Sequence, residues 1–565
     1  MMAHLRRLIL ARLRSQSAAM AMLRPLVQAA RRWWESNSWL YYHSWARQLA
    51  ARARQQVAPA PAAAPLLFIA LQANGPGGRQ RSLAALAAQT DAGWRLLECG
   101  EDAAAIAATQ HAAAAQAGWW LLLREGEVLA AHAVARLRSA AQAPDVSVIY
   151  ADEDAYGPFG LRFRPWLKPG FDPDLLLTQN LFGYAVAYRA TALTAHGSSG
   201  HALALAQTAP CLRGGATGVD HVADILLSRP LHTAAPWREL DPVAVQAALA
   251  ADGRGATLAP GLHGLPRVVW PQPQPAPLVS VIIPTRDRLD LLGPCVEDVL
   301  NRTEYPAIEV LIADNDSRDP TTLAQFKAWQ QDPRVRILPC PGAFNYSRIN
   351  NQAVGAAGGE MVLLLNNDTA VLNPNWLEEM VALAARPEVG AVGARLLYPN
   401  GRVQHAGVAL GFVGVAGHDL AFRAGDDPGP EDALCHTRSI SAVTAACLLV
   451  RRSLFLAVGG LDETALRVAY NDVDLCLRIR EAGFRNLITP HACLLHKESA
   501  SRGADMAPEH RARWQAECAV MQDRWGPLLR EDPYFNPLLA RSSINRGLAR
   551  LGSAALPGQG QGQQG

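Results

Sequence analysis

Two stretches of the chain repeat the same order of apolar and polar positions. Each opens with a continuous apolar run, at residues 66–71 in the first stretch and 279–284 in the second. A segment with helical periodicity follows in each, and then a second apolar run, at residues 94–98 and 308–313. Apolar runs that alternate with helical segments predict mostly parallel sheets covered by helices on both faces. We therefore expect two similar α/β domains in tandem.

Two proline-rich segments separate these stretches from their surroundings. Residues 57–65 are rich in proline and alanine, and residues 271–277 in proline and glutamine, so both favour extended linkers. The predicted organisation is a basic helical leader (1–56), a linker (57–65), a first body (66–270), a linker (271–277), a second body (278–540) and a flexible tail (541–565).

Composition and charge narrow the class of protein. Of the 565 residues, 50% are hydrophobic and 18% are charged, which excludes a disordered chain. The net charge of +3 does not indicate a nucleic-acid-binding protein. The 9 cysteines form no C-x-x-C pair, which favours reduced thiols in the cytoplasm. No secretory signal is evident, and residues 103–123 predict a helix running into a strand rather than a membrane span.

The leader carries most of the positive charge. Residues 1–56 contain ten arginines and one acidic residue, so the leader is strongly basic and the rest of the chain mildly acidic. Aromatic residues such as Trp33, Trp34 and Trp45 lie among the arginines, a pattern typical of basic amphipathic helices. Two interpretations are open. The leader contacts anionic lipid at the inner face of the cytoplasmic membrane, or it packs as a helical arm against the body or another subunit.

Acidic residues follow the apolar runs of the second body. Asp287 comes after the first run, Asp314 after the second and Asp368 after the third. The carboxyl ends of parallel strands meet at one edge of a sheet, so we expect a shared polar crevice there. A helix N-cap is the alternative for single acids such as Asp314. Asp368 can hold a hard divalent cation that also binds substrate phosphates, whereas His496 is either a further ligand or a structural histidine.

Four segments of the second body, in order, carry a resemblance to a known family. They are VSVIIPTRD (279–287), ADNDS (313–317), LLLNNDT (363–369) and YNDVDLCLR (470–478). The series resembles family 2 glycosyltransferases, which are inverting enzymes with the GT-A fold and nucleotide-sugar donors. The resemblance covers about residues 278–540. It implies two tandem GT-A-like domains, of which the second is catalytic.

The resemblance assigns residues to the donor side. Asp314 matches the acid that reads the nucleotide base, and Asp368 the metal-ligand position of the D-x-D region. Asn366 replaces the first acid of that motif, a form found among rhamnosyltransferase-like members, so hexosyl or rhamnosyl transfer is implied. The implied nucleotide-sugar-binding residues are Pro284, Thr285, Asp287, Asp314, Asn351, Asn366 and Asn367, and the implied ligands of a Mg²⁺ or Mn²⁺ ion are Asp368 and His496.

The resemblance also implies a general base and an acceptor side. The family's Glu-Asp pair falls on Asn471 and Asp472, so Asp472 is the predicted base, supported by Asn471 and Asp474. Asp474 is alternatively an i, i+4 ion pair with Arg478. A carboxylate in this position can take the proton of an acceptor hydroxyl as that hydroxyl attacks the anomeric carbon. The predicted acceptor-side residues are Thr444 and Asp462.

The first body lacks these acids. Arg124-Glu-Gly-Glu127 stands where the second body has Asn-Asn-Asp, and Arg124 in the metal position would repel a cation. The segment 201–206 that replaces the base region contains no acid. We expect a degenerate copy that positions the acceptor or supports the fold. The rival interpretation is a second active transferase with an altered metal site.

The resemblance implies sugar transfer from a nucleotide-diphosphate donor to a hydroxyl of a growing glycan or a lipid-linked acceptor. The expected setting is surface polysaccharide or O-antigen-type biosynthesis. Nucleotidyl transfer is an alternative, but the turn at residues 284–290 has no glycine to cradle a triphosphate. A non-catalytic scaffold that binds glycan or nucleotide is another, and the intact Asp314, Asp368 and Asp472 argue against it.

Overall fold

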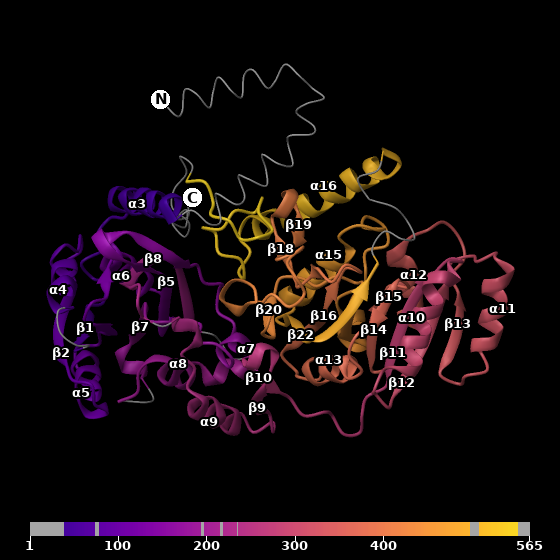
Figure 1. The fold of residues 1–565 in the computed structure, drawn as a ribbon, viewed down its shortest axis with the longest axis horizontal. Coiled ribbons are helices and arrows are strands. Elements are labelled where there is room, and N and C mark those ends of the chain that lie inside the picture. Colours follow the sequence, from indigo (N-terminus) through magenta and orange to yellow (C-terminus); the bar gives the residue numbers. More distant parts are fainter. Residues whose placement is uncertain are drawn as a thin grey trace, which may run out of the picture.

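The computed structural model describes residues 39–73, 78–193, 197–214, 218–233, 235–497 and 508–551. Two bodies lie side by side along the long axis of the molecule, each built around one large sheet (Figure 1). Leader residues 1–38, the segment 498–503 of the closing motif and tail residues 552–565 lie outside the described residues.

The first body is an eight-stranded sheet with helices around it. Its strands are β1 (Leu67–Gln72), β2 (Trp94–Cys99), β3 (Trp119–Arg124), β4 (Val128–Leu129), β5 (Val148–Tyr156), β6 (Arg162–Trp166), β7 (Val186–Arg189) and β8 (Val219–Pro230). Its helices are α4 (Arg79–Ala87), α5 (Ala103–Ala114), α6 (Ala133–Ala140), α7 (Pro173–Leu176), α8 (Gly200–Thr208) and α9 (Pro242–Asp252), and a hairpin of β9 (Thr257–Pro260) and β10 (Pro266–Val269) follows. The strand order is β2-β1-β3-β7-β5-β8-β4, with β6 paired to β5.

The second body is a ten-stranded sheet, again surrounded by helices. Its strands are β11 (Val279–Thr285), β12 (Ile308–Asp314), β13 (Val335–Pro339), β14 (Met361–Leu365), β15 (Thr369–Val371), β16 (Val389–Leu397), β17 (Val403–His405), β20 (Arg438–Ile440), β21 (Cys447–Arg451) and β22 (Arg485–His496). A separate hairpin joins β18 (Val408–Leu410) to β19 (Ala416–His418). The helices are α10 (Leu289–Asn301), α11 (Pro320–Trp329), α12 (Tyr346–Ala356), α13 (Trp376–Ala384), α14 (Arg452–Ala457), α15 (Asn471–Glu481) and α16 (Pro508–Arg530). The order is β13-β12-β11-β14-β21-β16-β22-β15, with β17 on β16 and β20 on β22.

The two sheets share one connectivity. The parallel pairs β1/β2, β1/β3 and β5/β8 correspond to β11/β12, β11/β14 and β16/β22. The antiparallel pairs β3/β7, β5/β7, β4/β8 and β5/β6 correspond to β14/β21, β16/β21, β15/β22 and β16/β17. The predicted fold class, two similar α/β domains with mostly parallel central sheets, is confirmed, and the antiparallel pairs join the later strands.

Burial explains why these runs form central strands. All five residues of β14 are buried, as are the first five of β11, because helices and loops cover both faces of the sheet. In α10 the apolar residues recur on one side of the helix. The buried residues of α10 are Leu291, Leu292, Cys295, Val296 and Val299.

The leader packs against the body over the part that is described. Helix α3 (Trp39–Gln56) buries Tyr42, Trp45 and Leu49. The hydroxyl of Tyr42 donates a 2.6 Å hydrogen bond to Oδ2 of Asp154, and the indole of Trp45 donates to the carbonyl of Ala549. The body-packing interpretation therefore holds for this helix, whose apolar face is not available to a membrane.

Buried ion pairs join the two bodies. Asp174 in α7 accepts hydrogen bonds of 2.5 Å from Nη1 of both Arg386 and Arg485. Arg386 also pairs with Glu388, which in turn accepts from Arg254 of the first body. Burial raises the pKa of Asp174, but the two arginines outweigh it and hold that pKa well below its ordinary range.

The segment after α16 also touches both bodies. Nδ2 of Asn536 donates to Oδ2 of Asp152 and to the carbonyl of Lys168 in the first body. Asp532 accepts hydrogen bonds from the amide of Leu410 and the hydroxyl of Ser441 in the second body. The two bodies are therefore joined at more than one place.

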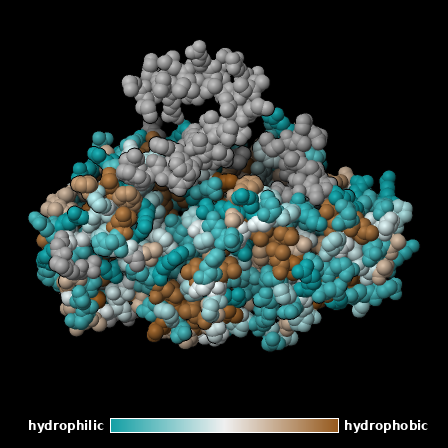
Figure 2. Space-filling view, in the orientation of Figure 1, coloured by the Kyte–Doolittle hydropathy of each residue, from teal (hydrophilic) through white to brown (hydrophobic). Residues whose placement is uncertain are grey.

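The outer surface is largely hydrophilic on the face that Figure 2 shows, with hydrophobic residues in separate patches. Among the helices that the structure describes, none combines the length and apolar character that crossing a bilayer requires. The segment 103–123 forms α5 and the greater part of β3, as predicted.

Candidate active site

One edge of the second sheet collects most of the predicted site residues. Strands β11, β12, β14, β16 and β22 run in the same direction, so their carboxyl ends lie at the same edge. Thr285 ends β11, Asp314 ends β12, Asn366 follows β14 and His496 ends β22. Strand β21 runs the opposite way, so the residues that precede it, including Thr444, lie at this edge too.

Asp368 and His496 face each other at the centre of this edge. Strand β15 pairs with β22 so that Thr369 lies opposite His496, and this register places Nε2 of His496 3.1 Å from Oδ1 of Asp368. Both side chains are buried. Nδ2 of Asn366 lies 3.1 Å from the same Nε2. The first and last residues of the D-x-D region therefore both meet the histidine.

Gln404 fixes the orientation of His496. Its Oε1 accepts a 2.6 Å hydrogen bond from Nδ1 of His496, and its Nε2 donates to the backbone carbonyl of His496. Nε2 is therefore the ring nitrogen that faces Asp368.

This donor set fits a divalent cation. A carboxylate oxygen and an imidazole nitrogen about 3 Å apart have the spacing of neighbouring ligands around a small ion with bonds of about 2.1 Å. The described part of the chain has no cluster of three or more His, Cys, Asp or Glu residues able to hold a metal. A cation bound by Asp368 and His496 would take its other ligands from substrate and water.

Asp472 lies in the first turn of α15. Its Oδ2 accepts a 3.0 Å hydrogen bond from the amide of Ala445, and its Oδ1 accepts from the amide of Val473. The carboxylate is only partly buried, so it is held in place and still accessible. Tyr346 connects this side to the metal side, because its hydroxyl lies 3.1 Å from the carbonyl of Ala445 and 3.4 Å from Oδ1 of Asn366.

The donor-side acids organise one loop. Oδ1 of Asp314 accepts from the amide of Ser317, and Oδ1 of Asp287 accepts from the amides of Arg318 and Asp319. Asp319 is the N-cap of α11, so the N-cap alternative applies to it. Pro284 precedes Thr285 in β11, and Oγ1 of Thr285 accepts from Nδ2 of Asn367, which ties this loop to the D-x-D region.

Asp474 does not join the group around Asp472. It is fully buried and binds Nε of Arg478, Nη1 of Arg524 and the indole of Trp525, at 2.6–2.9 Å. The ion-pair alternative therefore describes it, and Asp474 anchors α16 to α15. Asn471 is also buried, and its amide donates to the carbonyl of Val468.

Three further predicted residues shape backbone rather than face the crevice. Both ends of the Asn351 amide bind the backbone of Leu461. Asp462 accepts from the amides of Thr464 and Ala465 and pairs with Arg524. Thr444 precedes Ala445, whose amide binds Asp472, and its Oγ1 accepts from the amide of Ala446.

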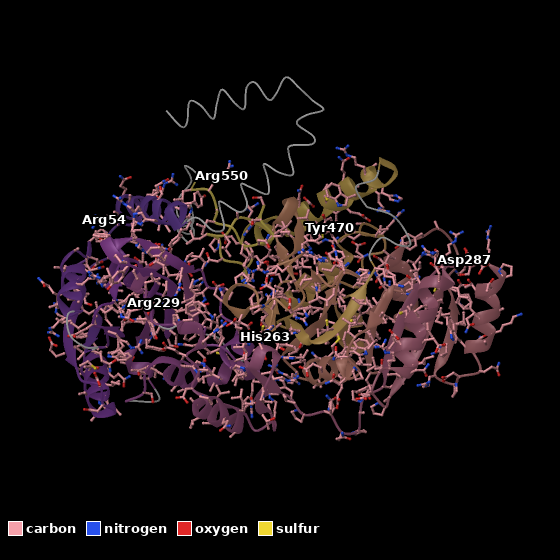
Figure 3. All side chains as sticks on the ribbon, in the orientation of Figure 1. Arg54, Arg229, His263, Asp287, Tyr470 and Arg550 are labelled. Atoms are coloured by element: carbon pink, nitrogen blue, oxygen red, sulfur yellow. The ribbon has the colours of Figure 1, made fainter. Side chains whose placement is uncertain are left out.

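The first body has no equivalent of these groups. By strand register, Arg124 takes the place of Asn366, Gly126 that of Asp368 and Arg229 that of His496. The helix that corresponds to α15 is α8, whose sequence GHALALAQT has no acid. Figure 3 shows Arg229 and Asp287 toward opposite ends of the molecule, with Tyr470, which precedes α15, between them.

Glu127, next to Gly126, gives the first body a pH-dependent stability. Burial raises its pKa from 4.5 to about 7. The folded protein then binds this proton more tightly than the unfolded chain, so the unfolding free energy falls as the pH rises from about 4.5 to about 7. We expect Glu127→Gln to abolish this pH dependence, which amounts to at most about 3 kcal/mol of unfolding free energy between about pH 4.5 and about pH 7. Urea midpoints on both sides of the window test it, and identical pH slopes in both proteins would contradict it.

Comparison with known proteins agrees with this geometry. The family model described as Glycosyl transferase family 2 matches residues 280–458. An uncharacterized protein of Sinorhizobium fredii is 41% identical over 414 residues, 70% of this chain and 45% of that protein. The O-antigen biosynthesis protein RfbC of Myxococcus xanthus is 37% identical over 444 residues, 75% of this chain and 34% of that protein.

A shorter relative is covered almost entirely. The N-acetylglucosaminyl-diphospho-decaprenol L-rhamnosyltransferase of Mycobacterium tuberculosis is 30% identical over 275 residues, 44% of this chain and 88% of that protein. The chain spans less than half the length of the two longer relatives.

Proposed function

The chain belongs to glycosyl transferase family 2, and we propose that its second body transfers a sugar, with inversion, from a nucleotide-diphosphate donor to a hydroxyl of a growing glycan. One observation carries the proposal. A continuous series of contacts runs from Asp472 through Ala445 and Tyr346 to Asn366, and on through His496 to Asp368. It holds a carboxylate base and a pair of cation ligands at one edge of the sheet.

The roles follow from the two ends of this series. Asp472 takes the proton of the acceptor hydroxyl while that oxygen forms a bond to the anomeric carbon and the bond to the diphosphate breaks. One displacement at the anomeric carbon inverts its configuration. The loop held by Asp287 and Asp314 is the proposed nucleotide site, because it lies at the same edge and Asn367 ties it to the D-x-D region.

Asp368 and His496 are the proposed ligands of a Mg²⁺ or Mn²⁺ ion. When bound, such a cation neutralises the charge that develops on the departing nucleoside diphosphate. Gln404 keeps Nε2 of His496 available to it.

Relatives and residue patterns narrow the proposed substrate class. The named relatives are an O-antigen biosynthesis protein and a rhamnosyltransferase for a diphospho-decaprenol acceptor. We propose hexosyl or rhamnosyl transfer to a glycan or lipid-linked acceptor, in surface polysaccharide synthesis at the cytoplasmic side of the membrane. If the leader contacts the membrane, it does so through residues other than those on the buried face of α3. The family match does not favour nucleotidyl transfer or a scaffold role.

A donor panel tests the proposed function. We expect the full chain with Mg²⁺ or Mn²⁺ to hydrolyse one nucleotide sugar slowly in the absence of acceptor, and chelation of the metal to stop it. Asp368→Ala should reduce this hydrolysis by about ten-fold or more. Asp332→Asn is the matched control, because Asp332 pairs with Arg334 on the surface at the end of α11. Hydrolysis that is independent of both metal and Asp368 would overturn the metal assignment, and the absence of any donor hydrolysis or binding would overturn the function.

A further inference from the structure

The first body has a hollow of about 630 Å³ at the carboxyl edge of its sheet. Its walls come from the segments that follow β1, β3, β5 and β8. The residues that carry the argument are Arg81, Glu125, Gly126, Tyr156, Phe159 and His232. Because the two sheets share one connectivity, this hollow occupies the place that the active site has in the second body.

The hollow is large enough to hold a ligand, but it lacks the groups proposed for catalysis in the second body. Gly126 stands at the register position of Asp368, so the carboxylate of that position is missing, and the neighbouring Glu125 that lines the hollow is paired with Arg79. Arg229 stands at the position of His496, and α8 provides no base. The remaining site can bind a ligand and cannot activate one in the manner of the second body.

Phe159 lies at the rim of the hollow, and the fold does not require an aromatic side chain at this position. Its side chain is fully exposed, and its backbone is left-handed, with φ 58°, in the turn between β5 and β6. The corresponding turn between β16 and β17 closes with the same backbone hydrogen bond, Gly401 to Tyr398 in place of Gly160 to Gly157, but Asn400, at the place of Phe159, is not left-handed. A left-handed turn position suits asparagine better than phenylalanine. The aromatic ring is therefore not required by the turn.

A second aromatic group and several polar groups line the same hollow. The hydroxyl of Tyr156 donates a 2.6 Å hydrogen bond to the carbonyl of Gly126, which fixes its ring. The guanidinium of Arg81 lies 4.7 Å from the centre of that ring. Glu125 is held by Arg79 at 3.1 Å, and His232 lies on the wall after β8. Fixed aromatic surface beside hydrogen-bonding groups suits a ligand with one apolar face and many hydroxyls.

We propose that this hollow binds sugar residues of the glycan, with a ring stacked on Phe159 and hydroxyls bound by Arg81, Glu125 and His232. The proposal rests on the proposed function, because it assigns the first body the task of holding the acceptor of the second. Charged groups on the wall disfavour a lipid chain, and Gly126 and Arg229 in place of Asp368 and His496 disfavour a metal-bound nucleotide held as in the second body.

Phe159→Asn in the full chain tests the proposal, since asparagine suits the backbone of this turn. The matched control is Phe422→Asn, because Phe422 is also exposed and left-handed, with φ 67°, but stacks on Tyr398 in the second body. Binding is measured by native gel electrophoresis in gels containing rhamnan, mannan or chitin oligosaccharides. We expect at least one glycan to retard the wild-type chain and the control equally, and to bind Phe159→Asn about ten-fold more weakly.

Two further measurements separate the possible failures. Donor hydrolysis without acceptor reports on the second body alone, and Phe159→Asn should leave it unchanged. If donor hydrolysis is normal and no glycan retards the chain, the glycan site is overturned while the proposed function stands. The same conclusion holds if a glycan retards Phe159→Asn as strongly as the control Phe422→Asn. Weaker binding of Phe159→Asn to phosphatidylglycerol vesicles, with glycan binding intact, would overturn it in favour of a membrane contact.

Discussion

Replacing Asp472 with asparagine is expected to lower the turnover number for sugar transfer by about 10²–10⁴-fold. The asparagine side chain keeps an oxygen that can accept from the amide of Ala445, and it loses only the acceptor for the amide of Val473. It cannot take a proton from the acceptor hydroxyl. The loss should therefore appear in kcat, with little change in the KM for the nucleotide sugar.

The control for this variant is its affinity for the nucleotide part of the donor, measured directly with the nucleotide alone. Equal affinity in Asp472→Asn and the wild type would show that the crevice is intact. An unchanged turnover number would remove Asp472 from the role of base and would support a binding scaffold. Tyr346→Phe offers a milder comparison, because it removes the hydroxyl that bridges Ala445 and Asn366 and leaves the carboxylate in place.

Asp174→Ala is expected to lower the unfolding free energy by about 3–5 kcal/mol. The variant takes the nearest carboxylate from both Arg386 and Arg485, whose side chains are only 3% and 16% exposed. Each buried guanidinium keeps the cost of leaving water and loses the nearest carboxylate that offset it, although Arg386 retains its pair with Glu388. Since these contacts join the two bodies, we also expect the bodies to unfold in separate steps, seen as two transitions in urea.

A surface pair provides the matched control. Asp290 pairs with Arg288 at 2.8 Å, and their side chains are 62% and 38% exposed. Asp290→Ala should therefore change stability by about 1 kcal/mol or less. If both variants had equally small effects, the buried pairs would not be what holds the bodies together.

The sheet could be predicted from the chain because its central strands are buried on both faces. The runs at 279–284 and 361–365 are apolar at almost every position, a pattern typical of strands buried on both faces. The ends of such runs also mark the edge of the sheet that carries the acids: Asp314 ends β12, and Asp368 follows β14. The short antiparallel strands, such as β17 and β20, are set by contacts between distant segments and gave no comparable signal.

The site was predictable at its strand ends and less so elsewhere. Nothing in the segment 401–407 shows that Gln404 meets His496, because that contact depends on the β16/β17 hairpin lying beside the end of β22. Asp474 shows the opposite error. Its closeness to Asp472 in sequence suggested a shared role, but two residues apart on a helix the side chains point in different directions. Tyr346 bridges the site only because α12 passes both Asn366 and Ala445.

The hydrogen bond from Asn536 to Asp152 joins residues 384 positions apart, and it has a consequence for how the protein is made. At about 5–20 residues per second, a ribosome adds Asn536 about 20–80 s after Asp152. Within that interval the first body becomes complete in sequence, and Oδ1 of Asp152 can bind the amide of Lys168 and the imidazole of His221. Its Oδ2 lacks the side-chain amide of Asn536 until the last part of the second body has been made.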